Sequence, residues 1–203
     1  LKIKPQGWTI FVGETGCGKS WCLEKLALLL QHQSISYSLI QQEPYLYNDT
    51  IESNIFLGIE PTPEKIKLAK EYLQKFGLTV LNEDLDGLLA MELGENGKRV
   101  SGGQAKRISL IRSLVADVDY IIWDDPFSSI DLILESEILT QIKYDPRLKN
   151  KTFIITSHRL STVRLCDEVI FIDKKEGLKE HGETKELLNK NSQVRGFFEK
   201  QNS

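Results

Sequence analysis

A segment near the start of the chain has the residue types and the spacing of a phosphate-binding loop. Gly13–Ser20 reads Gly-Glu-Thr-Gly-Cys-Gly-Lys-Ser, a G-x-x-x-x-G-K-S pattern. Glycines let the backbone curl so that successive N–H groups face a chain of phosphates. Lys19 would reach the β- and γ-phosphates, and the Ser20 hydroxyl would bind Mg²⁺. The predicted nucleotide contacts are Gly13, Glu14, Thr15, Gly16, Cys17, Gly18, Lys19 and Ser20.

The surroundings of this segment favour the nucleotide interpretation over a glycine turn formed by chance. Residues 8–12 are β-branched and aromatic, and predict a buried strand that ends at the loop. Residues 20–31 carry a broad apolar stripe and predict a helix that starts at the loop. Because the N-terminus of a helix attracts phosphate, a strand, a loop and a helix in this order predict nucleotide binding.

A second cluster of polar residues, Asp124-Asp125-Pro126, directly follows the apolar run 120–123. A carboxylate at the end of a buried strand is how phosphate-loop enzymes orient Mg²⁺. We assign that role to Asp124, acting through bound water, since Mg²⁺ keeps several waters. Asp125 would then point toward the γ-phosphate as a base or a water-positioning group. A turn or helix cap is the simpler reading of this tripeptide alone, and the upstream loop makes the functional reading the better one.

The rest of the pattern predicts an α/β fold with a mostly parallel sheet flanked by helices. Helical stretches separate strand-like runs, and we divide the chain as one domain, 1–203, with a helical insertion near 48–113. The predicted strands are 8–12, 35–40, 120–123, 152–156 and 169–172. The predicted helices are 20–31, 63–76 and 104–115, and 82–99 reads as a loop region.

Composition limits the class of protein. The 203 residues are 40% hydrophobic and 27% charged, with a net charge of −3, as in ordinary globular domains. That charge offers no general attraction to nucleic acid, so we expect no nucleic-acid partner. The longest apolar candidate, Leu26–Leu30, is far too short to span a bilayer. Since the chain starts at Leu1 rather than at Met, we expect it to be a piece of a longer protein. Three scattered cysteines, Cys17, Cys22 and Cys166, indicate a reducing compartment.

Several further motifs, in the right order, resemble an ATP-binding cassette (ABC) domain of the P-loop NTPase fold. Val100-Ser101-Gly102-Gly103-Gln104 resembles the family signature L-S-G-G-Q, and Gln42-Glu43-Pro44 resembles its Q-loop. Ser128-Ser129-Ile130-Asp131 is similar to the D-loop, and Thr156-Ser157-His158-Arg159 to the switch-histidine segment. The segments 48–55 and 180–188 look like those of exporter-type cassettes. The resemblance covers nearly the whole chain.

This resemblance implies a cytosolic ATPase domain of a membrane transporter, on the cytoplasmic face of the membrane. It implies ATP and Mg²⁺ as cofactors, and as partners the transmembrane domain of the same transporter and a second ABC domain, identical or different, paired head to tail across ATP. The catalytic residues would be Asp125, His158, Gln42 and Lys19, and the magnesium ligands Ser20, Gln42 and Asp124. Gln42 and His158 would also contact the nucleotide. Ser101, Gly102, Gly103 and Gln104 would cap the γ-phosphate bound to the partner.

The chain also departs from the family pattern. Asp125 stands where active cassettes carry glutamate, which predicts slow hydrolysis at the chain's own site. With Glu92–Gly97, this aspartate resembles the first cassette of C-subfamily transporters. The family's adenine-stacking aromatic residue lies upstream of this chain, and Trp8 is expected in the core instead. Lys19 and Gln42 are 23 positions apart, fewer than usual, so we expect a trimmed hairpin and an incomplete N-terminal β-subdomain.

Two other functions stay open from the sequence. A nucleotide-gated regulatory or channel cassette would bind ATP with little hydrolysis, and Asp125 is compatible with it. A soluble ABC ATPase outside transport would carry a long coiled coil, a zinc module or a second cassette, and none is visible in these 203 residues. Transmembrane helices encoded upstream of the chain would separate a transporter from both alternatives.

Overall fold

The computed structural model describes residues 3–189 and 191–201, apart from the side chains at 96 and 201. It divides into two compact units. The first unit comprises the residues up to 41, 119–126 and those from 142 onward, and the second comprises 42–118 and 127–141. The predicted insertion, 48–113, falls within the second unit.

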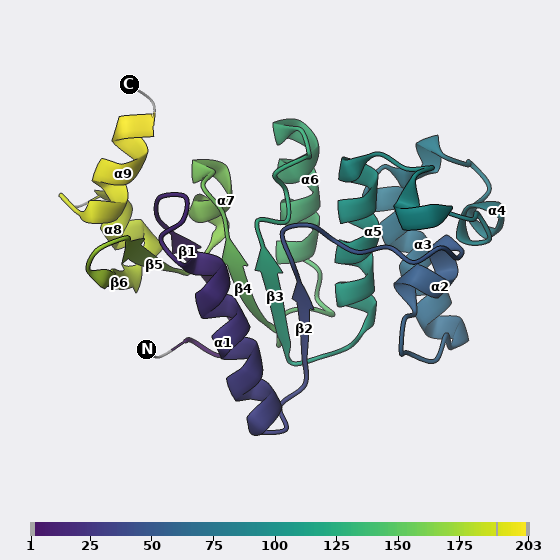
Figure 1. The fold of residues 1–203 in the computed structure, drawn as a ribbon, viewed down its shortest axis with the longest axis horizontal. Helices are drawn as coiled ribbons and strands as arrows, with labels where there is room; N and C mark the ends of the chain where they lie inside the picture. Colours follow the sequence, from purple (N-terminus) through teal and green to yellow (C-terminus); the bar gives the residue numbers. More distant parts are fainter. Residues whose placement is uncertain (1–2, 190, 202–203) are drawn as a thin grey trace. The chain divides into compact units, whose positions relative to one another are not determined.

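The first unit is built on a six-stranded sheet with the strand order β2-β3-β4-β1-β5-β6 (Figure 1). From β2 to β5 the neighbouring strands run parallel, whereas β6 pairs antiparallel with β5. The strands are β1 (Trp8–Val12), β2 (Tyr37–Ile40), β3 (Tyr120–Asp124), β4 (Thr152–Thr156), β5 (Glu168–Asp173) and β6 (Gly177–Glu183). The predicted α/β class with a mostly parallel sheet is confirmed.

Helix α1 (Lys19–His32) packs on one face of this sheet. Its apolar residues Leu23, Ala27 and Leu30 are buried against strand residues of β1, β3, β4 and β5. Those strand residues are Phe11, Ile122, Ile154, Ile170 and Ile172. Burial of this continuous apolar surface holds the start of α1 in place at the carboxyl end of β1.

The opposite side chains of the same strands form an aromatic cluster. Trp8 of β1 is buried and stacks on Phe153 of β4, with ring centroids 4.6 Å apart. Trp123 of β3 meets the same phenylalanine edge to face at 5.3 Å. The prediction that Trp8 is a core residue is thus confirmed, and strands buried on both faces explain the nearly continuous apolar sequence of β1 and β4.

Two strand predictions needed correction. The run 35–40 forms a strand only from Tyr37, because Ser34 adopts a left-handed conformation with φ 56° and the Ile35 N–H caps α1 by donating to the Leu30 carbonyl at 2.9 Å. Strand β6 was not predicted at all. Its sequence Gly-Leu-Lys-Glu-His-Gly-Glu is mostly exposed at the sheet edge, where polar residues replace the apolar alternation used to recognise strands.

Three short helices complete the first unit in the carboxyl half of the chain. They are α7 (Leu160–Leu165), α8 (Thr184–Asn189) and α9 (Gln193–Gln201). Helix α9 contacts the β5–β6 pair and α8, and Phe197 on it meets Phe171 of β5 edge to face at 5.7 Å. All three helices line one cavity described below, and α9 also lines a second.

The second unit is helical, with α5 at its centre. Its elements are α2 (Ile51–Ile55), α3 (Pro63–Lys75), η1 (Leu78–Val80), α4 (Leu85–Leu89), η2 (Glu95–Gly97) and α5 (Gly102–Val115), and α6 (Leu132–Lys143) begins in it. Both α2 and α3 pack against α5, whose residues Ile108, Leu110, Ile111 and Leu114 are buried. The predicted helices 63–76 and 104–115 are confirmed within two residues at either end.

The prediction of a loop over 82–99 was wrong in part, because α4 and η2 lie within it. The side chain of Asp84 caps α4 by accepting from the N–H groups of Asp86 and Gly87. Leu88 and Leu89 bury the other side of the helix. A helix this short carries too few residues to show a period in the sequence, so tertiary burial stabilises it instead.

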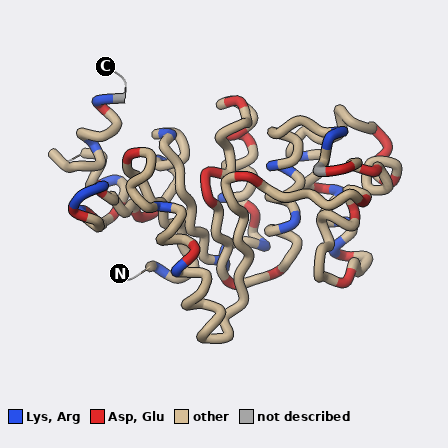
Figure 2. The backbone as a smooth tube through the Cα atoms, viewed as in Figure 1, with Lys and Arg blue, Asp and Glu red and all other residues tan. Residues whose placement is uncertain are grey.

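Charged residues of both signs alternate along the backbone of each unit (Figure 2). Such mixing matches the small net charge of −3. Among the described residues, no helix has both the length and the apolar character that crossing a membrane requires.

Candidate functional site

The predicted phosphate loop joins β1 to α1, as its sequence indicates. Gly13, Gly16 and Gly18 all have positive φ, at 149°, 77° and 97°. A Cβ at Gly13 would lie 2.2 Å from the Ile172 carbonyl oxygen, so any side chain there would collide with β5. At Gly16 and Gly18 a Cβ would meet nothing within 4 Å. The loop is therefore anchored to the sheet at one end and borders open space at the other two glycines.

Lys19 spans the loop from its carboxyl end. Its Nζ donates to the carbonyl oxygens of Gly13, at 2.8 Å, and Glu14, at 2.9 Å. The sulfur of Cys17 lies 3.7 Å from the same nitrogen. These contacts hold the ammonium group beside the curled backbone, where a cation is needed to neutralise a bound anion.

Helix α1 starts at this loop without a side-chain cap. Its N-cap is Gly18 in a left-handed conformation, and no side chain accepts a hydrogen bond from the first turn. The Cys22 N–H closes the first turn on the Gly18 carbonyl at 3.0 Å. Ser20, in that turn, is exposed. An uncapped first turn of a 14-residue helix leaves N–H groups and the positive dipole end for an anion.

One hydroxyl group bonds to both aspartates at the end of β3, Asp124 and Asp125. Thr156, at the end of β4, donates from Oγ1 to Asp124 Oδ1 at 2.6 Å and accepts from the Asp125 backbone N–H at 2.8 Å. Asp124 is buried, with 8% of its surface exposed. Asp125 has φ 43°, a left-handed conformation that is unusual for a residue with a side chain. Backbone strain of this kind is often found at functional sites.

His158 approaches the second aspartate from the segment after β4. Its Nδ1 lies 3.8 Å from Asp125 Oδ1, and its ring is 56% exposed. A cavity of about 410 Å³ brings the phosphate loop and this histidine together, and its lining residues are Gly13, Glu14, Thr15, His158, Phe197 and Lys200. The first unit thus brings Lys19, Asp124, Asp125 and His158 to the carboxyl ends of adjacent parallel strands, the usual place for a ligand in such sheets.

Three residues of this region were not predicted from the sequence as site residues. Thr156 was read only as part of the histidine segment, although it holds both aspartates. Phe197 and Lys200 of α9 line the cavity, but they lie about 180 positions after the loop and no motif marks them. The amphipathic pattern of α9 was the available signal, and it indicated only a packed helix.

The residues of the first unit fit a nucleoside triphosphate with Mg²⁺. The open space at Gly16 and Gly18, the uncapped α1 and the Lys19 ammonium suit phosphate oxygens. Among the described residues, no three His, Cys, Asp or Glu side chains are grouped to hold a metal. A magnesium ion here would therefore take most ligands from phosphate and water, which is how Mg²⁺ commonly binds.

The other predicted contacts belong to the second unit. Gln42 is exposed and is the first residue of the second unit, directly after residue 41 of the first unit. Ser101 caps α5: its hydroxyl accepts from the Gln104 N–H at 3.2 Å, and Gln104 Oε1 accepts from the Ser101 N–H at 2.7 Å. This reciprocal capping box satisfies two backbone donors. The roles of these residues toward a nucleotide stay predictions.

Gly103 explains why the signature segment needs a glycine. A Cβ there would lie 2.7 Å from the carbonyl oxygen of Ser129 in the predicted D-loop. A hydrogen bond between Lys106 and the Ser128 side chain joins the same two segments. The signature segment and the D-loop therefore pack as one surface within the second unit.

Comparison with known proteins identifies the family. The model of the family described as ABC transporter matches residues 1–128. The chain belongs to this family. The match includes the phosphate loop, both aspartates and the signature segment, so the recognition of an ABC nucleotide-binding domain is confirmed.

Named relatives of this ABC domain are full-length transporters. The chain is 32% identical to an ATP-dependent lipid A-core flippase of Vibrio cholerae, over 91% of this chain and 34% of the flippase. It is 32% identical to the ABC multidrug transporter atrD of Emericella nidulans, over 94% of this chain and 15% of the transporter. The chain thus spans about a third or less of the relatives' length. These names support an exporter-type domain.

A solved structure confirms the fold of the ABC domain. A bacterial Atm1-family ABC exporter with ATP bound superposes with a TM-score of 0.82 at 22% identity, over 99% of this chain and 38% of that chain. The predicted P-loop NTPase fold is confirmed. The closer resemblance to the first cassette of C-subfamily transporters and the incomplete β-subdomain stay predictions.

Proposed function

We propose that this ABC domain binds and hydrolyses ATP with Mg²⁺ as the motor of a membrane transporter, and that it pairs with a second ABC domain around the bound ATP. The transporter exports its substrate, and the domain works on the cytoplasmic face of the membrane, joined to a transmembrane domain of the same transporter. It needs no nucleic-acid partner. The exporter assignment rests on the flippase and multidrug names of its relatives.

One observation carries the nucleotide part of this proposal. Lys19 Nζ is bonded to the Gly13 and Glu14 carbonyls, beside the uncapped start of α1 and the cavity that contains His158. A cation, a set of N–H donors and open space converge there. That combination is complementary to a triphosphate and to few other metabolites.

Each residue of the first unit has a proposed role. Lys19 and the backbone of Gly13–Gly18 would hold the β- and γ-phosphates, and Ser20 and Asp124 would hold Mg²⁺. The metal would neutralise charge that develops on the phosphate oxygens. Thr156 keeps Asp124 in place through its 2.6 Å hydrogen bond. His158 would contact the γ-phosphate.

Asp125 is proposed to position the attacking water poorly. Its carboxylate is one methylene shorter than the glutamate of active family members, which withdraws it by about 1.5 Å, one carbon–carbon bond. A misplacement of about 1 Å can reduce a rate on the order of 10²-fold. We therefore propose tight binding of ATP with slow hydrolysis at this site.

The second unit supplies the proposed contact with a partner ABC domain. Ser101, Gly102, Gly103 and Gln104 form an exposed or half-buried helix start, which would cap the γ-phosphate held by the partner. Two such domains would then enclose two ATP molecules head to tail, and the pair would open after hydrolysis. The partner is an identical or a different ABC domain.

Calorimetry with Mg-ATP tests the proposal. The Lys19→Ala variant should lose most of its affinity, because the phosphates lose the cation that faces them. The matched control is Lys174→Ala, which removes one exposed cation from the β5–β6 turn. Equal Mg-ATP affinity for the Lys19→Ala variant and the unchanged chain would contradict the assignment of this site.

A regulatory cassette that binds ATP and scarcely hydrolyses it is the second candidate. The short side chain of Asp125, in place of the glutamate of active family members, favours it. The two candidates differ in turnover by the assembled transporter: a motor hydrolyses ATP during transport, whereas a gate changes state on binding alone.

A further inference from the structure

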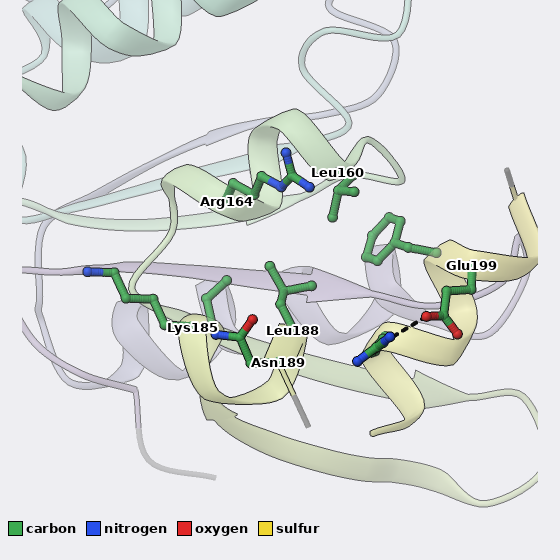
Figure 3. Close-up of a pocket in the computed structure, with 9 residues that line it drawn as sticks. Leu160, Arg164, Lys185, Leu188, Asn189 and Glu199 are labelled. Carbon is green, nitrogen blue, oxygen red and sulfur yellow. Dashed lines mark hydrogen bonds and ion pairs between the residues drawn. The ribbon is translucent and has the colours of Figure 1, made fainter. Parts of the chain in front are cut away.

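A second cavity in the first unit lies among α7, α8 and α9, apart from the phosphate loop. Its volume is about 510 Å³, within the range of small-molecule sites. Figure 3 shows Leu160 of α7 and Leu188 of α8 facing each other across it, with Arg164 beside Leu160. Phe198 of α9, which is buried, lines the same cavity.

Thr184, which lines this cavity, has a buried hydroxyl with no hydrogen-bond partner among the described residues. Thr184, the first residue of α8, is 2% exposed, and its Oγ1 finds no donor or acceptor among the described residues. It lines the cavity. A buried hydroxyl without a partner is unfavourable, and native structures rarely keep one. A ligand that accepts a hydrogen bond here would remove that cost.

The cavity also has unbalanced positive charge. Arg195 is paired with Glu199 at 2.7 Å, shown by the dashed line in Figure 3. Arg164 and Lys185 make no ion pair or hydrogen bond within the part of the chain that the structure describes. Three carboxylates line the adjoining cavity, together with Arg164 and Lys185. Two of them have other partners, since Asp167 pairs with Lys143 at 3.1 Å and Glu168 with His181 at 3.5 Å, and Glu183 is the third.

From these features we infer that the cavity binds a small organic carboxylate with an apolar tail. Arg164 would bind the carboxylate of the ligand, since a guanidinium group can donate two parallel hydrogen bonds to a carboxylate. The Thr184 hydroxyl would donate to the ligand, and Lys185 would add charge at the rim. The apolar tail would lie against Leu160, Leu188 and Phe198. The site is independent of the proposed nucleotide function.

Calorimetry of the full chain with sodium octanoate tests this site. Octanoate carries both required features, acetate only the charge, and octan-1-ol only the tail. We expect saturable 1:1 binding of octanoate, and binding about tenfold weaker or more for either other probe. Arg164→Ala should weaken octanoate binding by about tenfold, whereas Lys174→Ala, with the same loss of charge on an exposed turn, should leave it unchanged.

A second variant separates ligand binding from a structural role. Thr184→Val replaces the unpaired hydroxyl with a methyl group of similar size. It should raise the melting temperature of the free chain by about 2–4 °C and weaken octanoate binding by about fivefold. Failure of octanoate to saturate at millimolar concentration, or equal affinity for the Arg164→Ala chain, would overturn the proposal.

Discussion

Nδ1 of His158 lies 3.8 Å from Oδ1 of Asp125. The two residues follow adjacent parallel strands, His158 after β4 and Asp125 after β3. The distance exceeds that of a direct hydrogen bond, so the two side chains are neighbours without being locked together. A small movement of either would bring them into contact. Both residues therefore belong to one proposed reaction centre, and variants of each report on it.

Substitution of Asp125 tests whether this centre is slow. We expect Asp125→Glu to raise the steady-state ATPase rate of the assembled transporter, because the longer side chain restores the reach of the carboxylate. Asp125→Asn should change the rate little. If the asparagine variant lost all turnover and the glutamate variant gained none, Asp125 would be a competent base and the proposed slow site would be wrong.

Thr156 is expected to stabilise the fold through Asp124. Thr156→Val removes the donor to a buried carboxylate and the acceptor for the Asp125 N–H, and should lower the free energy of unfolding by about 2–3 kcal/mol. Thr156→Ser keeps the hydroxyl and loses one methyl group, which costs about 1 kcal/mol. Urea unfolding measures both. Equal stability of the two variants would show that the hydroxyl contributes nothing.

The three cysteines should differ in reactivity at pH 8. Burial, and the nearby Cys17 sulfur, raise the pKa of the Cys22 thiol, and burial raises the pKa of Cys166 strongly. A raised pKa leaves less thiolate, which is the reactive form. Iodoacetamide should therefore label Cys17 first, as read by peptide mass spectrometry, and Mg-ATP should slow that labelling. Labelling of Cys17 at the same rate with and without Mg-ATP would place its thiol outside the nucleotide site.

Ser101 allows pairing to be tested without damage to α5. Ser101→Asp keeps an N-cap acceptor but would direct a carboxylate at the γ-phosphate of the partner, so ATP-dependent pairing should fail while nucleotide binding survives. Ser101→Thr, which keeps the hydroxyl, is the matched control and should still pair. Light scattering with and without ATP measures the assembly. Pairing by the aspartate variant at the normal ATP concentration would contradict the proposed capping.

Local patterns were sufficient for the part of the site around α1. The spacing of glycines, lysine and serine over Gly13–Ser20 determines a loop whose hydrogen bonds lie within six residues. The apolar strands β1 and β4 were predicted at their observed bounds, since strands buried on both faces are apolar throughout. The order of the family motifs was equally legible in the sequence.

Other features were decided by the tertiary structure alone. The hydroxyl of Thr156 reaches Asp124 across 32 positions of chain, and Gly103 is required by the Ser129 carbonyl 26 positions away. Strand β6 forms because the β5 edge accepts it, although its own residues are polar and exposed. The cavity around Thr184 needs three separate helices. Each of these depends on which distant segments pack together, and residue type and short-range spacing do not carry that information.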